Sequence, residues 1–299
     1  MIDRRFRREL CFALRSITRR LPTLYGFNAY LRWQRRWTPV DEEYCVTDVD
    51  ETITMYLRPS EFVDFALFYE AHRYEQSERQ VLWSHLKQGA TFIDVGAHIG
   101  FYTLLAAKRV GRQGRVFAFE PDPVTYARLI RNVKANPELA SRIHLFERAA
   151  SDSEGVAQLY RSTAWNMGGN TLAEAEGAPA TSVETTTLDH IFLQEAFDPR
   201  CTVVKIDVEG HEIKVLRGFH KTLSRKDKPI LVVEAADQHL RRAGASSEHL
   251  VKELKSLGYQ LFEIRHPQPR PLDDTRLPSF ANLLALPSQC LIGTYRDCG

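Results

Sequence analysis

Residues 91–100, TFIDVGAHIG, decide the fold class that the sequence predicts. The first five form a short apolar run interrupted by one aspartate, which is typical of a buried β-strand. Gly96 and Gly100 then let the backbone turn tightly, and a helix is expected from about Phe101 to Val110. A strand that leads through a glycine-bearing turn into a helix indicates the first half of a parallel β-α-β unit.

The same alternation continues along the chain. It predicts an α/β fold with a mostly parallel, doubly wound sheet and helices on both faces. Further strands are expected at 115–120, 143–149, 203–207, 230–235, 259–264 and 283–287, and an inserted hairpin at 157–162 and 183–191.

The first 75 residues are expected to form a separate region, before a main domain at 76–299. Residues 1–37 contain ten arginines, no lysine and two acidic residues, although the whole chain has a net charge of only +2. Their pattern predicts two helical segments, and residues 43–57 are expected to form a small hairpin. A basic amphipathic helix can lie on an anionic membrane, or it can pack on the protein with its arginines exposed; both remain open.

Composition places the chain among ordinary globular proteins, with 43% hydrophobic and 26% charged residues. No apolar run is long enough for a membrane span, and none of signal-peptide length follows the N-terminus. The five cysteines are scattered and contain no C-x-x-C pair, which argues against a disulfide framework and against a cysteine-based zinc site. A cytoplasmic location is expected. The sequence also leaves open a peripheral contact with a membrane through residues 1–37.

Three strand ends predict a nucleoside pocket. Asp94 ends the first strand, Glu120 ends the second where both hydroxyls of a ribose can be bound, and Asp152 follows the third near an adenine edge. The alternative is that Asp94 and Glu120 only cap the helices that follow their strands. The glycines are spaced G-x-x-x-G rather than G-x-G-x-x-G, so no pyrophosphate site is expected. S-adenosylmethionine fits, since it combines an adenosine with a cationic tail and carries no phosphate.

The stretch 203-VVKIDVEGHE-212 brings ionisable side chains to the end of another buried strand. This strand is expected to lie beside the first one, so Asp207, Glu209 and His211 should surround the place where an acceptor meets a methyl group. His211 is the first candidate for a general base because its ordinary pKa is near neutrality. Asp207 is expected to orient the acceptor or the cofactor amine. The alternative is that the acids and His211 only begin the next helix.

Other side chains are candidates for contacting the acceptor. Trp165 and Asn166 lie in a loop of the inserted hairpin, where an indole could stack on a sugar ring, and Glu234 ends a later strand. Glu234 could alternatively join Asp207, Glu209 and His211 around magnesium. Spacing alone does not make a metal site, so no metal is expected.

Five blocks resemble, in order, those of FkbM-family S-adenosylmethionine-dependent methyltransferases, over roughly residues 91–287. They are FIDVGAHIGFYT, FAFEPDP, TLDHI, VVKIDVEGHE and NLLALP. The resemblance implies a class I methyltransferase (Rossmann-like) fold with a seven-stranded sheet and an antiparallel last strand, and O-methylation, often of sugars or natural products. The family usually has asparagine at the position of His98, which we include among the cofactor-binding residues with Asp94, Gly96 and Gly100.

Two other classes of function remain as alternatives. One is a nicotinamide-dependent dehydrogenase, which the missing G-x-G-x-x-G fingerprint argues against. The other is a non-catalytic module that tethers partners or membrane through the basic arm. Nucleic acid is not expected as a partner, because the body of the chain is acidic and carries no readable basic groove.

Overall fold

The computed structural model describes residues 4–18, 42–161, 169–173 and 177–288. They form two compact units, an N-terminal unit that ends at Gln76 and a main unit that begins at Ser77. We describe each unit by itself. The expected domain boundary between residues 75 and 76 stays a proposal.

The described residues of the N-terminal unit form two helices and a two-stranded ribbon. Its elements are α1 (Arg4–Thr18), β1 (Tyr44–Val46), β2 (Met55–Leu57) and α3 (Phe62–Glu70). The predicted hairpin is confirmed, because β1 and β2 pair antiparallel with Cys45 opposite Tyr56. The connection between them is not only polar, since it buries Val49 and Ile53.

Helix α1 packs within this unit through one face. Its buried side chains are Cys11, Leu14, Arg15 and Thr18, whereas Ile17 is 52% exposed. The Arg15 guanidinium donates to the Phe68 carbonyl at 2.7 Å and forms an ion pair with Asp48. An arginine therefore supplies part of the packed face, and its contacts hold α1 against the hairpin and α3.

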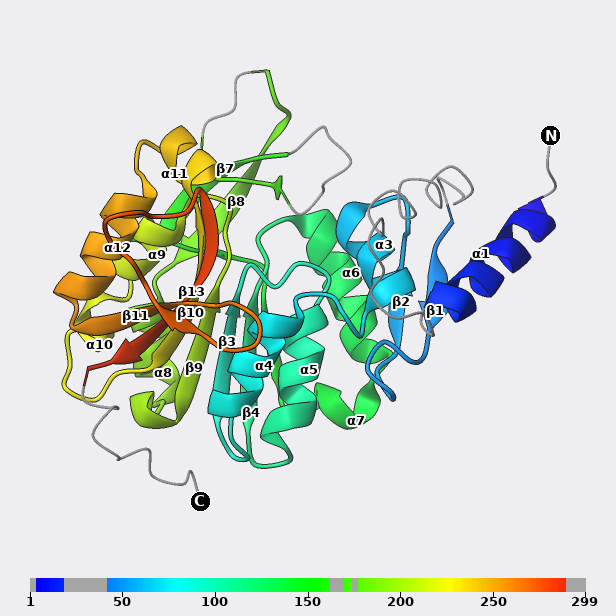
Figure 1. Ribbon diagram of the computed structural model, residues 1–299, viewed down its shortest axis with the longest axis horizontal. Coiled ribbons are helices and arrows are strands. Elements are labelled where there is room, and N and C mark those ends of the chain that lie inside the picture. The colour runs from blue at the N-terminus through cyan, green and yellow to red at the C-terminus, as the bar shows by residue number, and fades with distance from the viewer. Residues whose placement is uncertain (1–3, 19–41, 162–168, 174–176, 289–299) are drawn as a thin grey trace. The chain divides into compact units, whose positions relative to one another are not determined.

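The main unit is built on an eight-stranded sheet (Figure 1). In order across the sheet, the strands are β12 (Arg270–Pro271), β11 (Tyr259–Glu263), β13 (Phe280–Pro287), β10 (Ile230–Ala236), β9 (Thr202–Ile206), β3 (Thr91–Val95), β4 (Arg115–Phe119) and β5 (Ile143–Phe146). The five strands from β10 to β5 are parallel, and β13 is antiparallel to both of its neighbours. The predicted mostly parallel sheet with an antiparallel last strand is confirmed; the two-residue β12 was not predicted.

Helices connect the strands and cover the sheet (Figure 1). They are α4 (Gln76–His85), α5 (Phe101–Val110), α6 (Pro123–Lys134), α7 (Pro137–Ala140), α8 (Leu188–Glu195), the 3-10 turn η2 (Pro199–Cys201), α9 (Glu212–Arg217), α10 (His220–Leu223), α11 (Asp237–Arg242) and α12 (Ser247–Ser256). Fully buried rings of Phe117, Phe119 and Phe219 lie in the core between sheet and helices. Each contributes about 1.5–3 kcal/mol relative to an exposed ring.

A small second sheet contains the inserted hairpin. Its strands are β6 (Ala149–Ala150), β7 (Gly155–Tyr160) and β8 (Ala180–Thr186), and β7 pairs antiparallel with β8 as predicted. The expectation that the second hairpin strand continues to residue 191 is wrong. Thr187 ends the strand by capping α8, because its side chain accepts from the backbone N–H of His190.

The cysteines behave differently from the expectation. Cys11 and Cys45 form no disulfide bond, whereas Cys201 takes part in one. The cytoplasmic location stays a prediction. No helix in the described ranges is long and apolar enough to cross a membrane.

Candidate active site

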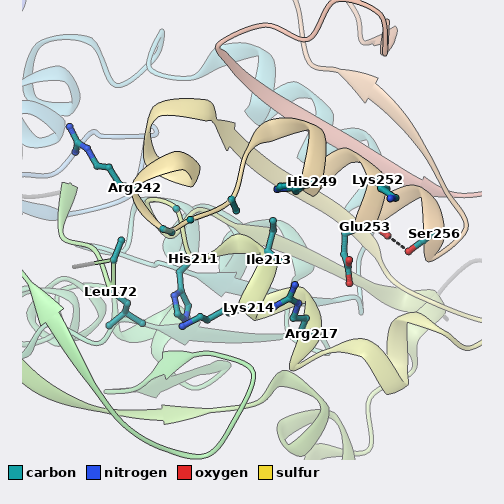
Figure 2. A pocket seen from close by; sticks show the side chains of 15 residues that line it. Leu172, His211, Ile213, Lys214, Arg217, Arg242, His249, Lys252, Glu253 and Ser256 are labelled. Carbon is teal, nitrogen blue, oxygen red and sulfur yellow. Dashed lines mark hydrogen bonds between the residues drawn. The ribbon is translucent and has the colours of Figure 1, made fainter. Parts of the chain in front are cut away.

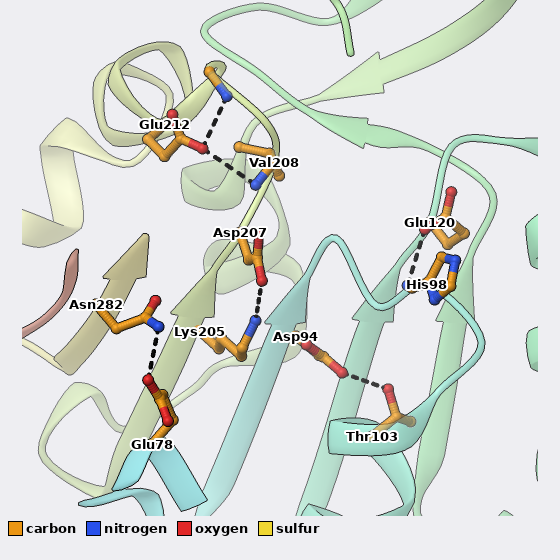
Figure 3. A network of polar contacts seen from close by, with 11 residues as sticks. Glu78, Asp94, His98, Thr103, Glu120, Lys205, Asp207, Val208, Glu212 and Asn282 are labelled. Atoms are coloured by element: carbon orange, nitrogen blue, oxygen red, sulfur yellow. Dashed lines mark hydrogen bonds and ion pairs between the residues drawn. The ribbon is translucent and has the colours of Figure 1, made fainter. Parts of the chain in front are cut away.

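Asp94 anchors the turn that follows the first strand of the parallel sheet. Its side chain is only 1% exposed, and Thr103 of α5 donates its hydroxyl to Asp94 Oδ2 at 2.6 Å (Figure 3). Burial raises the pKa of Asp94, and the positive charge of Lys205 partly offsets that rise. The capping alternative does not describe this contact, because the N-cap of α5 is Gly100. Asp94 instead fixes the start of α5 against β3.

The two glycines of this turn have conformations that favour glycine. Gly96 has φ = +86°, and a Cβ there would lie 1.9 Å from the backbone oxygen of Asp207. Gly100 has φ = +91°, and its Cβ would lie 2.5 Å from Leu129 Cδ1. A side chain at either position would therefore meet a neighbour as well as strain the backbone. The approach at Gly96 brings the turn after β3 against the end of β9.

His98 lies in the same turn with a left-handed φ of +49°. Its backbone N–H donates to Glu120 Oε2 at 2.9 Å, while its Nε2 is buried without a hydrogen-bond partner. Burial and the nearby charge of Arg128 lower the pKa of His98 to about 4. The ring is therefore neutral at physiological pH, and its free nitrogen can donate to or accept from a ligand.

His98→Asn is expected to leave folding and cofactor affinity within about threefold of the wild type. Asparagine tolerates the left-handed region better than most residues and keeps a polar side chain in place. His98→Val should instead lower the unfolding free energy by about 1–3 kcal/mol, because a β-branched residue strains this φ. Thermal unfolding and calorimetric titration of S-adenosylmethionine would measure both variants. Equal stability of the two would contradict the conformational reason given for His98.

Glu120 occupies the end of β4, as predicted. Its two carboxylate oxygens accept from the backbone N–H groups of His98 and Asp122, each at 2.9 Å. Burial raises the pKa of Glu120 to about 8, although these two amides stabilise its charged form. Each oxygen has a further lone pair, so the carboxylate can still accept from a pair of ligand hydroxyls.

Asp122 caps α6. Its Oδ2 accepts from the backbone N–H of Thr125, and its Oδ1 accepts from Arg161 Nη2 at 2.7 Å. Arg161 follows β7, so this ion pair ties the inserted hairpin to the loop that carries Glu120. Sequence reasoning missed Arg161, because nothing in the pattern after β7 indicates a partner 39 residues away.

Asp207 lies where the end of β9 meets the turn after β3. Its backbone N–H donates to the Val95 carbonyl at 3.0 Å, and its side chain pairs with Lys205 at 2.6 Å (Figure 3). Lys205 is buried and its ammonium lies 4.8 Å from the ring centre of Tyr102. The Asp207 side chain remains 29% exposed. A buried lysine thus orients a carboxylate that is still open to a ligand.

Glu209 and His239 form an ion pair beside Asp207. Glu209 has a left-handed φ of +52°, and its backbone oxygen accepts from the Thr171 hydroxyl at 2.7 Å. Its carboxylate lies in ion-pair contact with His239 Nδ1, and this contact raises the pKa of His239. Sequence reasoning missed His239; its position just after the strand at 230–236 was the available signal.

Two more carboxyl groups surround this pair. Glu212 Oε1 accepts from the backbone N–H groups of Val208 and Gly210, which shapes the loop after β9. Burial raises the pKa of Glu212 to about 7. Glu234, on β10, has a buried Oε2 without a hydrogen-bond partner. Burial and the charges of the neighbouring acids raise its pKa to about 10, so Glu234 is protonated at neutral pH.

Three of these side chains have the spacing of metal ligands. Glu209, Glu234 and His239 each place one donor atom within 4.8 Å of the others. The group differs from the set considered from sequence, because it contains His239 in place of His211. A divalent cation could bridge these donors if Glu234 lost its proton.

His211 and Asp152 make contacts of another kind. His211 is buried, its Nε2 lies 3.0 Å from the Ser151 hydroxyl, and burial lowers its pKa to about 4. Asp152 is exposed and accepts from the hydroxyls of Ser151 and Ser153. Ser151 thus links His211 and Asp152. Neither of them belongs to the Glu209–His239 ion pair. Trp165 and Asn166 lie outside the described residues.

The sheet order, with an antiparallel strand beside β10 and polar strand ends around β3, β4 and β9, defines a class I methyltransferase fold. Residues 94–261 match the family model of the methyltransferase FkbM domain, which is more than half of the chain. The chain therefore belongs to this family of S-adenosylmethionine-dependent methyltransferases. This supports a methyltransferase over the dehydrogenase and tethering alternatives.

Individual relatives are more distant. The chain is 28% identical over 163 residues to the hexuronic acid methyltransferase AglP of Haloferax volcanii, covering 54% of this chain and 64% of that protein. It is 29% identical over 163 residues to the methyltransferase sdnD of Sordaria araneosa, covering 45% and 62%. The match thus spans less than two thirds of either relative. Among solved structures, methyltransferase FkbM from Methylobacillus flagellatus is similar with a TM-score of 0.43 and 17% identity, covering 74% of this chain and 54% of that one.

Proposed function

We propose that the chain is an S-adenosylmethionine-dependent O-methyltransferase that acts on a hydroxyl of a saccharide or a sugar-bearing metabolite. The observation that carries this proposal is the Glu209–His239 pair next to Asp207, at the strand end that touches the Gly96 turn. A carboxylate–histidine pair suits removal of a hydroxyl proton. The name of the Haloferax relative, a hexuronic acid methyltransferase, supports a sugar acceptor.

The residues at the ends of β3, β4 and β9 fit the cofactor. We assign Glu120 to accept from the two ribose hydroxyls; its bond to the His98 backbone N–H and the unpaired ring nitrogen of His98 support this role. Asp207, partly exposed, is placed for the ammonium of the amino-acid tail, with Asp94 holding the turn between them. When bound, the cofactor supplies a methyl group already activated on a sulfonium sulfur.

The remaining chemistry is positioning and proton removal. Glu209 holds Nδ1 of His239, which leaves Nε2 to accept the proton of the acceptor hydroxyl. With the cofactor bound, the acceptor oxygen would receive its methyl group while the hydroxyl proton passes to His239 Nε2. In-line geometry is the main requirement of such a displacement. We therefore assign the base to His239 in place of His211, and keep Glu209 as the residue that orients it.

Removing metal ions is expected to leave the methylation rate unchanged. His239 Nδ1 is engaged by Glu209, and Glu234 is protonated near neutral pH, so two of the three possible ligands are poorly prepared for a cation. Rates would be compared in EDTA and in millimolar Mg²⁺ or Mn²⁺. A loss of activity in EDTA that Mn²⁺ restores would show that Glu209, Glu234 and His239 ligate a metal.

An acceptor screen tests the proposed function. Purified protein would be incubated with S-adenosylmethionine carrying a labelled methyl group and with uronic acids, neutral sugars, their oligosaccharides and glycolipids. We expect transfer of label to an acid- and base-stable ether, located by mass spectrometry and NMR. Label found as a methyl ester of a carboxylate would overturn the hydroxyl as the methylated group, and label found on nitrogen would overturn O-methylation. Failure of well-folded protein to bind the cofactor at all would overturn the methyltransferase proposal itself.

The basic arm has a separate proposal. We propose that residues 1–37 give peripheral contact with anionic membranes, since ten arginines lie in this stretch. Cosedimentation with vesicles with and without phosphatidylserine would test it, using residues 38–299 as the comparison. Equal binding of both forms would refute the contact.

A further inference from the structure

A cleft of about 620 Å³ opens between α9, α11 and α12 of the main unit (Figure 2). Its size lies within the range of roughly 300–1,000 Å³ that is usual for ligand sites. Lys214 and Arg217 contribute from α9, Arg242 from the end of α11, and Lys252 from α12. Sequence reasoning found no basic groove beyond the arm, because these four residues come from three separate segments.

The charge of the cleft is strongly positive and unbalanced. All four basic side chains belong to exposed residues, and none forms an ion pair with another residue in the described part of the chain. Glu253 is the one acid among the lining residues, all of which the structure describes. Lys214 and Arg217 are three positions apart on α9, so they share one face of that helix. Figure 2 shows these two residues and Lys252 along the same cleft.

The cleft adjoins the loop that carries Glu209, although neither Glu209 nor His239 lines it. Gly210 and His211 line it, and they directly follow Glu209 in the loop after β9. Arg242 lies three residues after His239 on the short helix α11, and a Cβ on Gly210 would meet the His239 backbone oxygen at 2.5 Å. The cleft and the Glu209–His239 pair are therefore joined through the backbone of Gly210 and the helix that carries both His239 and Arg242.

We propose that the cleft binds the acidic part of an anionic saccharide acceptor, whose carboxylates pair with the four unpaired cations while one of its hydroxyls reaches His239. This inference rests on the proposed function and specifies its acceptor class. An unpaired cluster of cations beside the base is suited to several negative charges in one extended molecule. A neutral sugar chain would leave the cluster unused.

Binding of defined oligosaccharides tests the proposal without turnover. The probes are tetragalacturonate, neutral maltotetraose and inorganic phosphate, each titrated calorimetrically into the full-length protein with S-adenosylhomocysteine present. We expect tetragalacturonate to bind at least tenfold more tightly than maltotetraose or phosphate, and more weakly as salt is raised from 50 to 300 mM.

Charge variants locate that binding. Arg217→Gln combined with Arg242→Gln is expected to weaken tetragalacturonate binding about tenfold, since two exposed charge contacts are lost. Lys226→Gln removes one exposed cation outside the cleft and is the matched control, expected to bind within twofold of the wild type. Thermal unfolding of each variant confirms that it is folded.

Two results would overturn the cleft as the site. One is equal affinity for tetragalacturonate and maltotetraose, and the other is unchanged affinity in the double variant. Titration of S-adenosylhomocysteine alone separates this proposal from the underlying function. If the protein binds tetragalacturonate but not S-adenosylhomocysteine, the methyltransferase proposal is overturned. If it binds S-adenosylhomocysteine but does not prefer tetragalacturonate over maltotetraose, only the acidic acceptor is overturned.

Discussion

At pH 9, where the Glu120 carboxylate is ionised, Glu120→Gln is expected to weaken S-adenosylmethionine binding about 100-fold. The carboxylate lies at the end of β4, buried, with one oxygen on each of two backbone N–H groups. The amide keeps the shape, but it offers one acceptor oxygen and turns an NH₂ group toward the other donor. Loss of a charge-assisted hydrogen bond costs about 1.5–3 kcal/mol, and about 2.7 kcal/mol corresponds to a hundredfold change in affinity.

The pH dependence of the wild type provides a second readout of the same residue. Burial raises the pKa of Glu120 to about 8, and the ionised form is the better acceptor for ribose hydroxyls. Cofactor affinity should therefore increase as the pH rises from 7 to 9 and should be flat over that range in Glu120→Gln. Calorimetric titration at several pH values would measure this dependence.

Glu138→Gln, an exposed carboxylate on α7, is the matched control for Glu120→Gln and should bind as the wild type does. Thermal unfolding must accompany the comparison, because Glu120→Gln disturbs contacts to His98 and Asp122. A folded Glu120→Gln protein that retains wild-type affinity would exclude the ribose role.

The cofactor half of the site was predictable because it depends on strand ends. Asp94, Glu120 and Asp207 each end a strand of the parallel sheet, and the carboxyl ends of parallel strands meet at one edge. The pattern of apolar runs locates those ends to within a residue or two. Side-chain roles at these positions then follow from burial and from which backbone amides are nearby.

The acceptor half was less predictable because it depends on loop conformation. His211 was the expected base, but it begins α9 and its ring bonds to Ser151, in the loop after β6. His239 lies in 237-DQHLRR-242, which has the pattern of an ordinary polar helix. The left-handed φ of Glu209 brings its carboxylate to His239, and no spacing rule indicates that conformation for a glutamate.

His239→Gln is expected to lower kcat by about 100- to 10,000-fold, the range that a positioned general base contributes. Cofactor affinity should stay within twofold, because none of the cofactor contacts proposed for Glu120 or Asp207 involves His239. His220→Gln, an exposed histidine on α10, is the control and should retain full activity. Rates would be followed as S-adenosylhomocysteine release with an acceptor from the screen.

The pH profile separates a base from a residue that only shapes the pocket. The carboxylate of Glu209 raises the pKa of His239 above its ordinary value of 6.5, so the active neutral form appears only as the pH rises through that raised value. The wild-type rate should therefore increase with pH up to that point. Glu209→Gln removes the cause of the shift, so its acid limb should move to lower pH while its maximal rate falls. Wild-type activity in His239→Gln, or an unmoved limb in Glu209→Gln, would exclude this assignment. A large loss in His211→Gln under the same conditions would return the base to His211.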